Sequence, residues 1–91
     1  MRVLKVTGSA GIDQTFGPMT VRNVRPANVL AGAVQIKRGG VVIETMPVGM
    51  DPNAAHPANQ RGYEDLQFNS TTGLLALNLA NGADVVLCFY S

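Results

Sequence analysis

Apolar and polar residues alternate along much of this chain, with the period of two that half-buried β-strands show. The alternation is clear in residues 2–7, 19–25 and 63–69. Within 19–25 the apolar parity changes, so we expect a β-bulge near Asn23. No segment carries a convincing helical spacing of apolar residues. The pattern therefore predicts an all-β chain.

Residues 33–46 carry a clear hairpin pattern. Two short apolar-alternating runs flank Gly39-Gly40. Glycine supplies the positive φ angles that a two-residue hairpin turn requires, and such a turn pairs Ile36 with Ile43. The predicted apolar face of this hairpin consists of Val34, Ile36, Val41 and Ile43.

Residues 74–90 predict a second hairpin, because Asn81-Gly82 stands between two apolar runs. With Ala80 paired to Ala83, both faces of the hairpin are apolar. Such a hairpin either sits inside a sandwich or presents its outer face to another chain. Its predicted interface residues are Leu74, Val85, Leu87 and Phe89.

Two long connections, 8–18 and 47–62, separate the predicted strands. A connection as long as 47–62 is unusual in a small domain and is typical of a functional or mobile segment. Its three prolines lower the entropic cost of ordering it against a partner. From this region we expect interface contacts by Met50, Asp51, His56 and Arg61, and from the adjoining run 63–69 by Tyr63.

Together these elements predict one domain, residues 1–91, with an all-β fold. We expect a small antiparallel β-sandwich or a jelly-roll-like barrel, with two tight hairpins and long loops. A chain of this length buries only about two-thirds of its unfolded surface, so its own core is thin.

The charge content sharpens this picture. Charged residues make up only 14% of the 91 residues, against about 25% in an average soluble domain. Residues 1–40 carry six basic and one acidic side chain, whereas residues 41–91 carry one basic and five acidic ones. Either the strands of the two halves interleave and mix the signs, or the basic face of one protomer meets an acidic face of another.

Candidate chemistry is sparse. His56 is the only histidine and has no evident nucleophile or metal-ligand partners. We expect Cys88 to be a core residue, since it lies in the most apolar strand. Adjacent Glu64 and Asp65 point to opposite faces of a strand and so do not form a catalytic pair. The sequence predicts no enzyme, no metal site and no cofactor.

Two further partner classes are disfavoured. A basic set with two aromatic residues could line a single-strand nucleic-acid groove, but a net charge of +1 is far below the usual footprint of such proteins. That set comprises Arg22, Arg25, Lys37, Arg38, Tyr63 and Phe68. The longest apolar runs are too short for a membrane span, and residues 1–8 lack the apolar core of a signal peptide. We expect neither a nucleic acid nor a membrane as partner.

In its low charge, short hairpins and long Pro/Asn/Ala connection, the whole chain resembles the small all-β virion accessory proteins of tailed bacteriophages. These are the decoration or cement proteins. The resemblance is one of overall style and implies a structural role. It implies a homotrimer that binds the outside of a capsid at the joints between capsomers. The implied partners are copies of the chain and the major capsid protein or another virion protein. The implied location is the capsid exterior, after synthesis in the host cytoplasm.

Two alternatives stay open. The first is a small lectin-like module that binds a ligand through Asn53, Asn59, Gln60 and Tyr63, because sugar sites combine amide side chains with an exposed aromatic ring. The second is an accessory protein that binds a host complex.

Overall fold

The computed structural model describes residues 1–9, 12–53 and 65–91, and this part of the chain forms eight β-strands and no helix. None of its segments is a helix long and apolar enough to cross a membrane. The strands are β1 (Arg2–Val6), β2 (Asp13–Thr15), β3 (Met19–Pro26), β4 (Val34–Arg38), β5 (Val41–Met46), β6 (Leu66–Phe68), β7 (Leu75–Leu79) and β8 (Val85–Tyr90).

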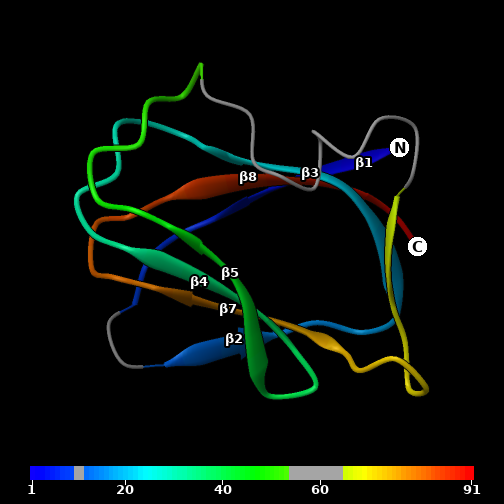
Figure 1. Cartoon of the computed structure of the whole chain (residues 1–91). Coiled ribbons are helices and arrows are strands. Elements are labelled where there is room, and N and C mark those ends of the chain that lie inside the picture. Colours follow the sequence, from blue (N-terminus) through cyan, green and yellow to red (C-terminus); the bar gives the residue numbers. More distant parts are fainter. Residues whose placement is uncertain (10–11, 54–64) are drawn as a thin grey trace.

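The strands form two four-stranded antiparallel sheets that pack as the two layers of a sandwich (Figure 1). Sheet A has the strand order β1-β8-β3-β6, and sheet B has the order β2-β7-β4-β5. The predicted all-β sandwich is confirmed. Each sheet contains strands from both halves of the chain, so the interpretation that the halves interleave is also confirmed.

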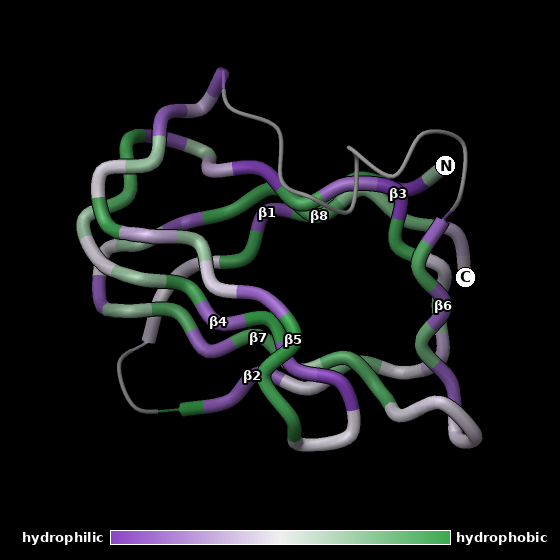
Figure 2. The backbone as a smooth tube through the Cα atoms, in the orientation of Figure 1, coloured by the Kyte–Doolittle hydropathy of each residue, from purple (hydrophilic) through white to green (hydrophobic). Residues whose placement is uncertain are grey.

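The core lies between the two sheets and is built by alternate residues of the central strands. The backbone drawn by hydropathy shows apolar and polar residues alternating along β4, whereas β8 is apolar along most of its length (Figure 2). From sheet A the most deeply buried residues are Val21, Val24, Phe68, Val85 and Leu87; from sheet B they are Val34, Ile36, Met46, Leu75, Leu77 and Leu79. Burial of this kind contributes about 25 cal/mol per Å² of apolar surface.

The tight turn between β4 and β5 is confirmed at Gly39-Gly40, where φ is 58° and 82°. These paired positive values are those of a type I′ hairpin turn. The predicted pairing of Ile36 with Ile43 is wrong, because Ile36 lies opposite Glu44. A bulge between Ile36 and Lys37 in the register leaves Ile43 as an extra residue on β5. Val41, which we expected on the apolar face, is 65% exposed.

The predicted hairpin over residues 74–90 is wrong. Strand β7 pairs with β2 and β4, whereas β8 pairs with β1 and β3 in the other sheet. The Asn81-Gly82 turn keeps a hydrogen bond from the Ala83 amide to the Ala80 carbonyl, but it carries the chain from one sheet to the other. In a hairpin, Leu75, Leu77 and Leu79 would face one side of the sheet, and Val85, Leu87 and Phe89 would face the other. Only one of these two apolar rows could then enter the core. The arch buries both rows, one from each sheet.

Two smaller features complete the comparison with the sequence. The bulge expected near Asn23 is confirmed, since the pairing of β3 with β8 shifts between Val21 and Asn23. Strand β2, inside the predicted connection 8–18, was missed because its three residues are all polar. It is held at the edge of sheet B by pairing with β7.

Candidate interaction surface

The two sheets present outer faces of different character. Residues directly opposite one another on neighbouring strands point to the same side of a sheet, so the pairing registers define each face. The outer face of sheet A carries Val3, Lys5, Thr20, Asn23, Arg25, Val86, Cys88 and Tyr90. The outer face of sheet B carries Asp13, Thr15, Gln35, Lys37, Val42, Thr45, Ala76 and Asn78.

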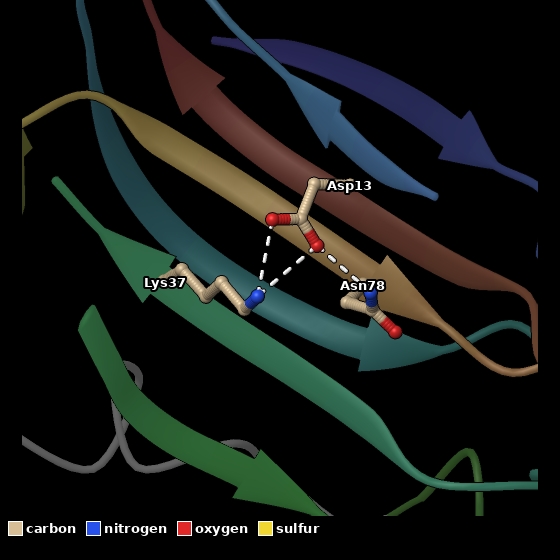
Figure 3. Close-up of polar contacts among 3 residues, drawn as sticks. All are labelled: Asp13, Lys37 and Asn78. Atoms are coloured by element: carbon tan, nitrogen blue, oxygen red, sulfur yellow. Dashed lines mark hydrogen bonds and ion pairs between the residues drawn. The ribbon is translucent and has the colours of Figure 1, made fainter. Parts of the chain in front are cut away.

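On the outer face of sheet B, polar side chains form hydrogen bonds with one another. The Lys37 ammonium donates to both carboxylate oxygens of Asp13, at 3.2 and 3.0 Å, and the Asn78 amide donates to Oδ1 of Asp13 at 2.8 Å (Figure 3). The hydrogen bond from Asn78, with a further contribution from Lys37, lowers the pKa of Asp13 below its ordinary value of 3.8. Three strands are thereby joined across this face.

The outer face of sheet A exposes two large apolar side chains, whereas that of sheet B exposes one, Val42. Val3 is 64% exposed and Tyr90 45%, and Met1 beside them is 68% exposed. Lys5 and Arg25 lie on either side of Val86 in the register. Arg22, beside the bulge, contacts Asp65 at 3.4 Å, which joins the basic half of the chain to the acidic half.

A depression of about 440 Å³ opens on this face. It is lined by Met1, Arg22, Asn23, Arg25, Val86 and Cys88. Asn23 is only 5% exposed, and its Oδ1 has no hydrogen-bond partner among the described residues. A second depression of about 430 Å³, at the Tyr90 end of sheet A, has no charged side chain in its lining.

The predicted interface residues fall into three groups. Val85, Leu87 and Phe89 are core residues, 0%, 0% and 8% exposed, and so are not available to a partner. Leu74 is 42% exposed. Met50 packs partly buried against the core, and Asp51 is exposed and accepts a hydrogen bond from the Asn53 amide. His56, Arg61 and Tyr63 lie outside the described residues, as do Asn59 and Gln60 of the lectin-like alternative.

The expectation for Cys88 is wrong. Its side chain is half-buried, faces away from the core and lines the depression on the outer face of sheet A. The cause is the alternation of β8, which turns Leu87 and Phe89 inward and Val86 and Cys88 outward. The apolar character of the segment concealed which parity faces the core.

The basic set weighed as a nucleic-acid groove is dispersed by the fold. Arg22 and Arg25 line the depression on sheet A, whereas Lys37 is on the outer face of sheet B. The Arg38 guanidinium lies over the Phe68 ring, 4.8 Å from its centroid, where the cation covers the core. These side chains do not share one groove.

Metal ligands do not gather in the described part of the chain, where no three His, Cys, Asp or Glu side chains are placed to hold an ion. Comparison with protein-family models, with curated proteins and with solved structures found no match to this chain. Its surface is therefore interpreted from its own residues.

Proposed function

We propose that this chain is a structural subunit of a virion, a decoration or cement protein whose copies associate, most simply as a trimer, on the outside of a capsid shell. The observation that carries the proposal is the contrast between its outer faces. A small domain rarely leaves exposed apolar residues side by side unless another surface covers them. Here Met1, Val3 and Tyr90 are exposed on or beside the outer face of sheet A.

The remaining features support burial rather than catalysis as the mode of action. The proposal assigns no catalytic residue, metal or cofactor to the chain. A rigid antiparallel sandwich with a low charge content can cover a seam in a shell by area alone. About 800 Å² per partner is sufficient for specific assembly.

The first test is the mass of the purified chain in solution. Multi-angle light scattering at micromolar concentration is expected to give a trimer, and the chain is expected to sediment with virus particles purified from the culture that carries its gene. A monomer that is also absent from the particles would contradict the proposal.

A matched pair of variants locates the surface. Val3→Asp places a charge on the exposed outer face of sheet A, and Val42→Asp places the same charge on the outer face of sheet B, where Val42 is 43% exposed. We expect Val3→Asp to abolish association and Val42→Asp to leave it intact. The opposite result would move the interface to sheet B.

A further inference from the structure

The second depression on sheet A opens where β3 begins and where β6 and β8 end. We call it the Tyr90 depression. In Figure 1 the C end of β8, the beginning of β3 and the yellow β6 lie together at one side of the molecule. The register places Thr20 of β3 directly opposite Tyr90 of β8 and Gln67 of β6. Because neighbouring strands are about 4.8 Å apart, a ring, a hydroxyl and a carboxamide form one row on the outer face, within reach of one small ligand.

The polar groups of this depression are accessible, and one of them is held in place. Tyr90 is 45% exposed, Gln67 is exposed and Thr20 is half-buried. Asn69, which also lines the depression, belongs to the turn that follows β6. Its Oδ1 accepts hydrogen bonds from two backbone amides of that turn, at 2.9 and 2.8 Å. These bonds fix the carboxamide and leave its Nδ2 group as a preorganised donor.

The lining of the depression bears on the charge of its ligand. None of its side chains is charged, whereas the neighbouring depression contains Arg22 and Arg25. A phosphate or carboxylate would therefore find no cationic side chain in the lining. The space of about 430 Å³ lies in the range of small-ligand sites and is open rather than enclosed. These features favour a small uncharged ligand that has an apolar face and several hydrogen-bonding groups.

We propose that the Tyr90 depression binds a neutral pyranose sugar at the exposed end of a glycan. A pyranose presents C–H groups on one face and hydroxyl groups at its rim, and each hydroxyl is both a donor and an acceptor. The C–H face packs on the Tyr90 ring, whose flat surface is apolar. The hydroxyl groups accept hydrogen bonds from Asn69 Nδ2 and Gln67 Nε2 and donate to Thr20 Oγ1.

This inference goes beyond the proposed function, because assembly by burial requires no ligand. The surface of that proposal and the Tyr90 depression meet at Tyr90 and extend from it in opposite directions. Val3 lies on the β1 side of β8, whereas the depression is lined from β3, β6 and the end of β8. A partner that covers Val3 therefore does not have to cover the depression.

Two other occupants fit this lining less well. Grooves for proline-rich segments are lined by several aromatic rings, but Phe68 is only 1% exposed, which leaves Tyr90 as the one exposed ring among the described lining residues. A nucleobase could stack on Tyr90, but proteins that bind single-stranded nucleic acids also place cationic side chains along the backbone. The lining has no such side chain. Both occupants serve as comparison probes.

An NMR titration that follows the backbone amides of the isotope-labelled chain tests the proposal. The probes are the methyl glycosides of glucose, galactose, mannose and N-acetylglucosamine, and glycerol is the control that has hydroxyl groups but no ring. We expect at least one glycoside to bind saturably with a Kd in the millimolar range, as suits an open site with one ring. The shifted signals are expected to belong to residues 18–20, 67–69 and 90–91. Glycerol, thymidine monophosphate and a proline-rich peptide are expected to give no saturable shifts there.

Variants at exposed positions locate the contacts. Tyr90→Leu keeps an apolar side chain but removes the ring, and it is expected to weaken binding of the glycoside about tenfold. Tyr90→Phe keeps the ring and is expected to keep the binding. Gln67→Leu removes a donor and is expected to weaken binding by about threefold to tenfold. Gln35→Leu makes the same change on the outer face of sheet B and is expected to leave binding unchanged.

The inference is overturned if no glycoside binds saturably, if glycerol gives the same shifts, if either comparison probe binds more tightly, or if Tyr90→Leu binds as the wild type does. Val3→Asp separates this site from assembly, since it is expected to abolish association and to keep sugar binding. A chain that joins particles but ignores every glycoside keeps its proposed function and loses this site. A monomer that is absent from particles but binds a glycoside does the reverse.

Discussion

The outer faces of the two sheets differ in how their polar and apolar side chains are arranged. Both belong to four-stranded antiparallel sheets of one sandwich, and both must face outward from a shared core. Sheet B uses Asp13, Lys37 and Asn78 to satisfy one another across three strands. Sheet A leaves Val3 exposed and Asn23 Oδ1 without a partner among the described residues.

This difference bears on which face would gain free energy from contact with a partner. A face whose donors and acceptors are matched gains nothing from a partner, and covering it would cost desolvation. A face with exposed apolar side chains gains from being covered, because apolar surface is removed from water. Under the proposed function, sheet A is therefore the face that we expect to contact a partner.

The largest expected effect tests which side of sheet A is its outer face. Leu87 and Cys88 are neighbours on β8, but Leu87 is fully buried and Cys88 faces outward. Leu87→Ala should lower the free energy of unfolding by about 2–5 kcal/mol, because it leaves a cavity between the sheets. Cys88→Ala should lower it by less than about 1 kcal/mol. Urea unfolding followed by circular dichroism measures both, and equal losses would refute the assignment of the faces.

Much of the fold can be predicted from the sequence, because strand periodicity and turn residues act over short stretches of chain. The period of two identifies most of the strands, Gly39-Gly40 fixes a turn that needs two positive φ values, and the parity change predicts the bulge beside Asn23. The connection at Asn81-Gly82 is a different case. A turn of that composition is compatible with a hairpin and with an arch, and only the packing of two large apolar rows into one core selects the arch.

The residues of the candidate interaction surface were much harder to predict from the sequence. Val85, Leu87 and Phe89 have the composition of an interface and also that of a core, and the choice depends on which sheet lies opposite. Asn23 gave no signal as a buried residue, because a polar residue in a strand is ordinarily solvated. In the folded chain it is only 5% exposed. The unpaired amide is visible only when the hydrogen bonds of neighbouring strands are known.

A smaller effect compares one asparagine from each outer face. Asn23→Leu should raise the free energy of unfolding by about 1 kcal/mol, because it removes a buried acceptor that lacks a partner. Asn78→Leu should lower it by about 1 kcal/mol, because Asp13 loses the hydrogen bond at 2.8 Å. Urea midpoints of the two variants provide the measurement.

The pair controls for strand propensity, since leucine replaces asparagine within a strand in both variants. A stabilised Asn23→Leu protein would show that the unpaired amide oxygen lowers the stability of the folded chain. Destabilisation of similar size in both variants would instead mean that Asn23 contributes to the fold as Asn78 does.

The smallest expected effect is the pH dependence of the Asp13 contacts on sheet B. Because the hydrogen bond from Asn78 lowers the pKa of Asp13 below 3.8, the folded state favours the carboxylate more than the unfolded state does. The resulting stability is complete at pH values above the ordinary pKa and is lost as the pH falls through the lowered value. The difference in urea midpoint between the wild type and Asp13→Ala should therefore be constant from pH 7 to about pH 5 and shrink towards pH 2. In an Asn78→Ala background the same comparison should depend less on pH. A difference that stays constant down to pH 2 would show that the contacts between Asp13, Lys37 and Asn78 do not stabilise the face, and the contrast between the two sheets would then rest on sheet A alone.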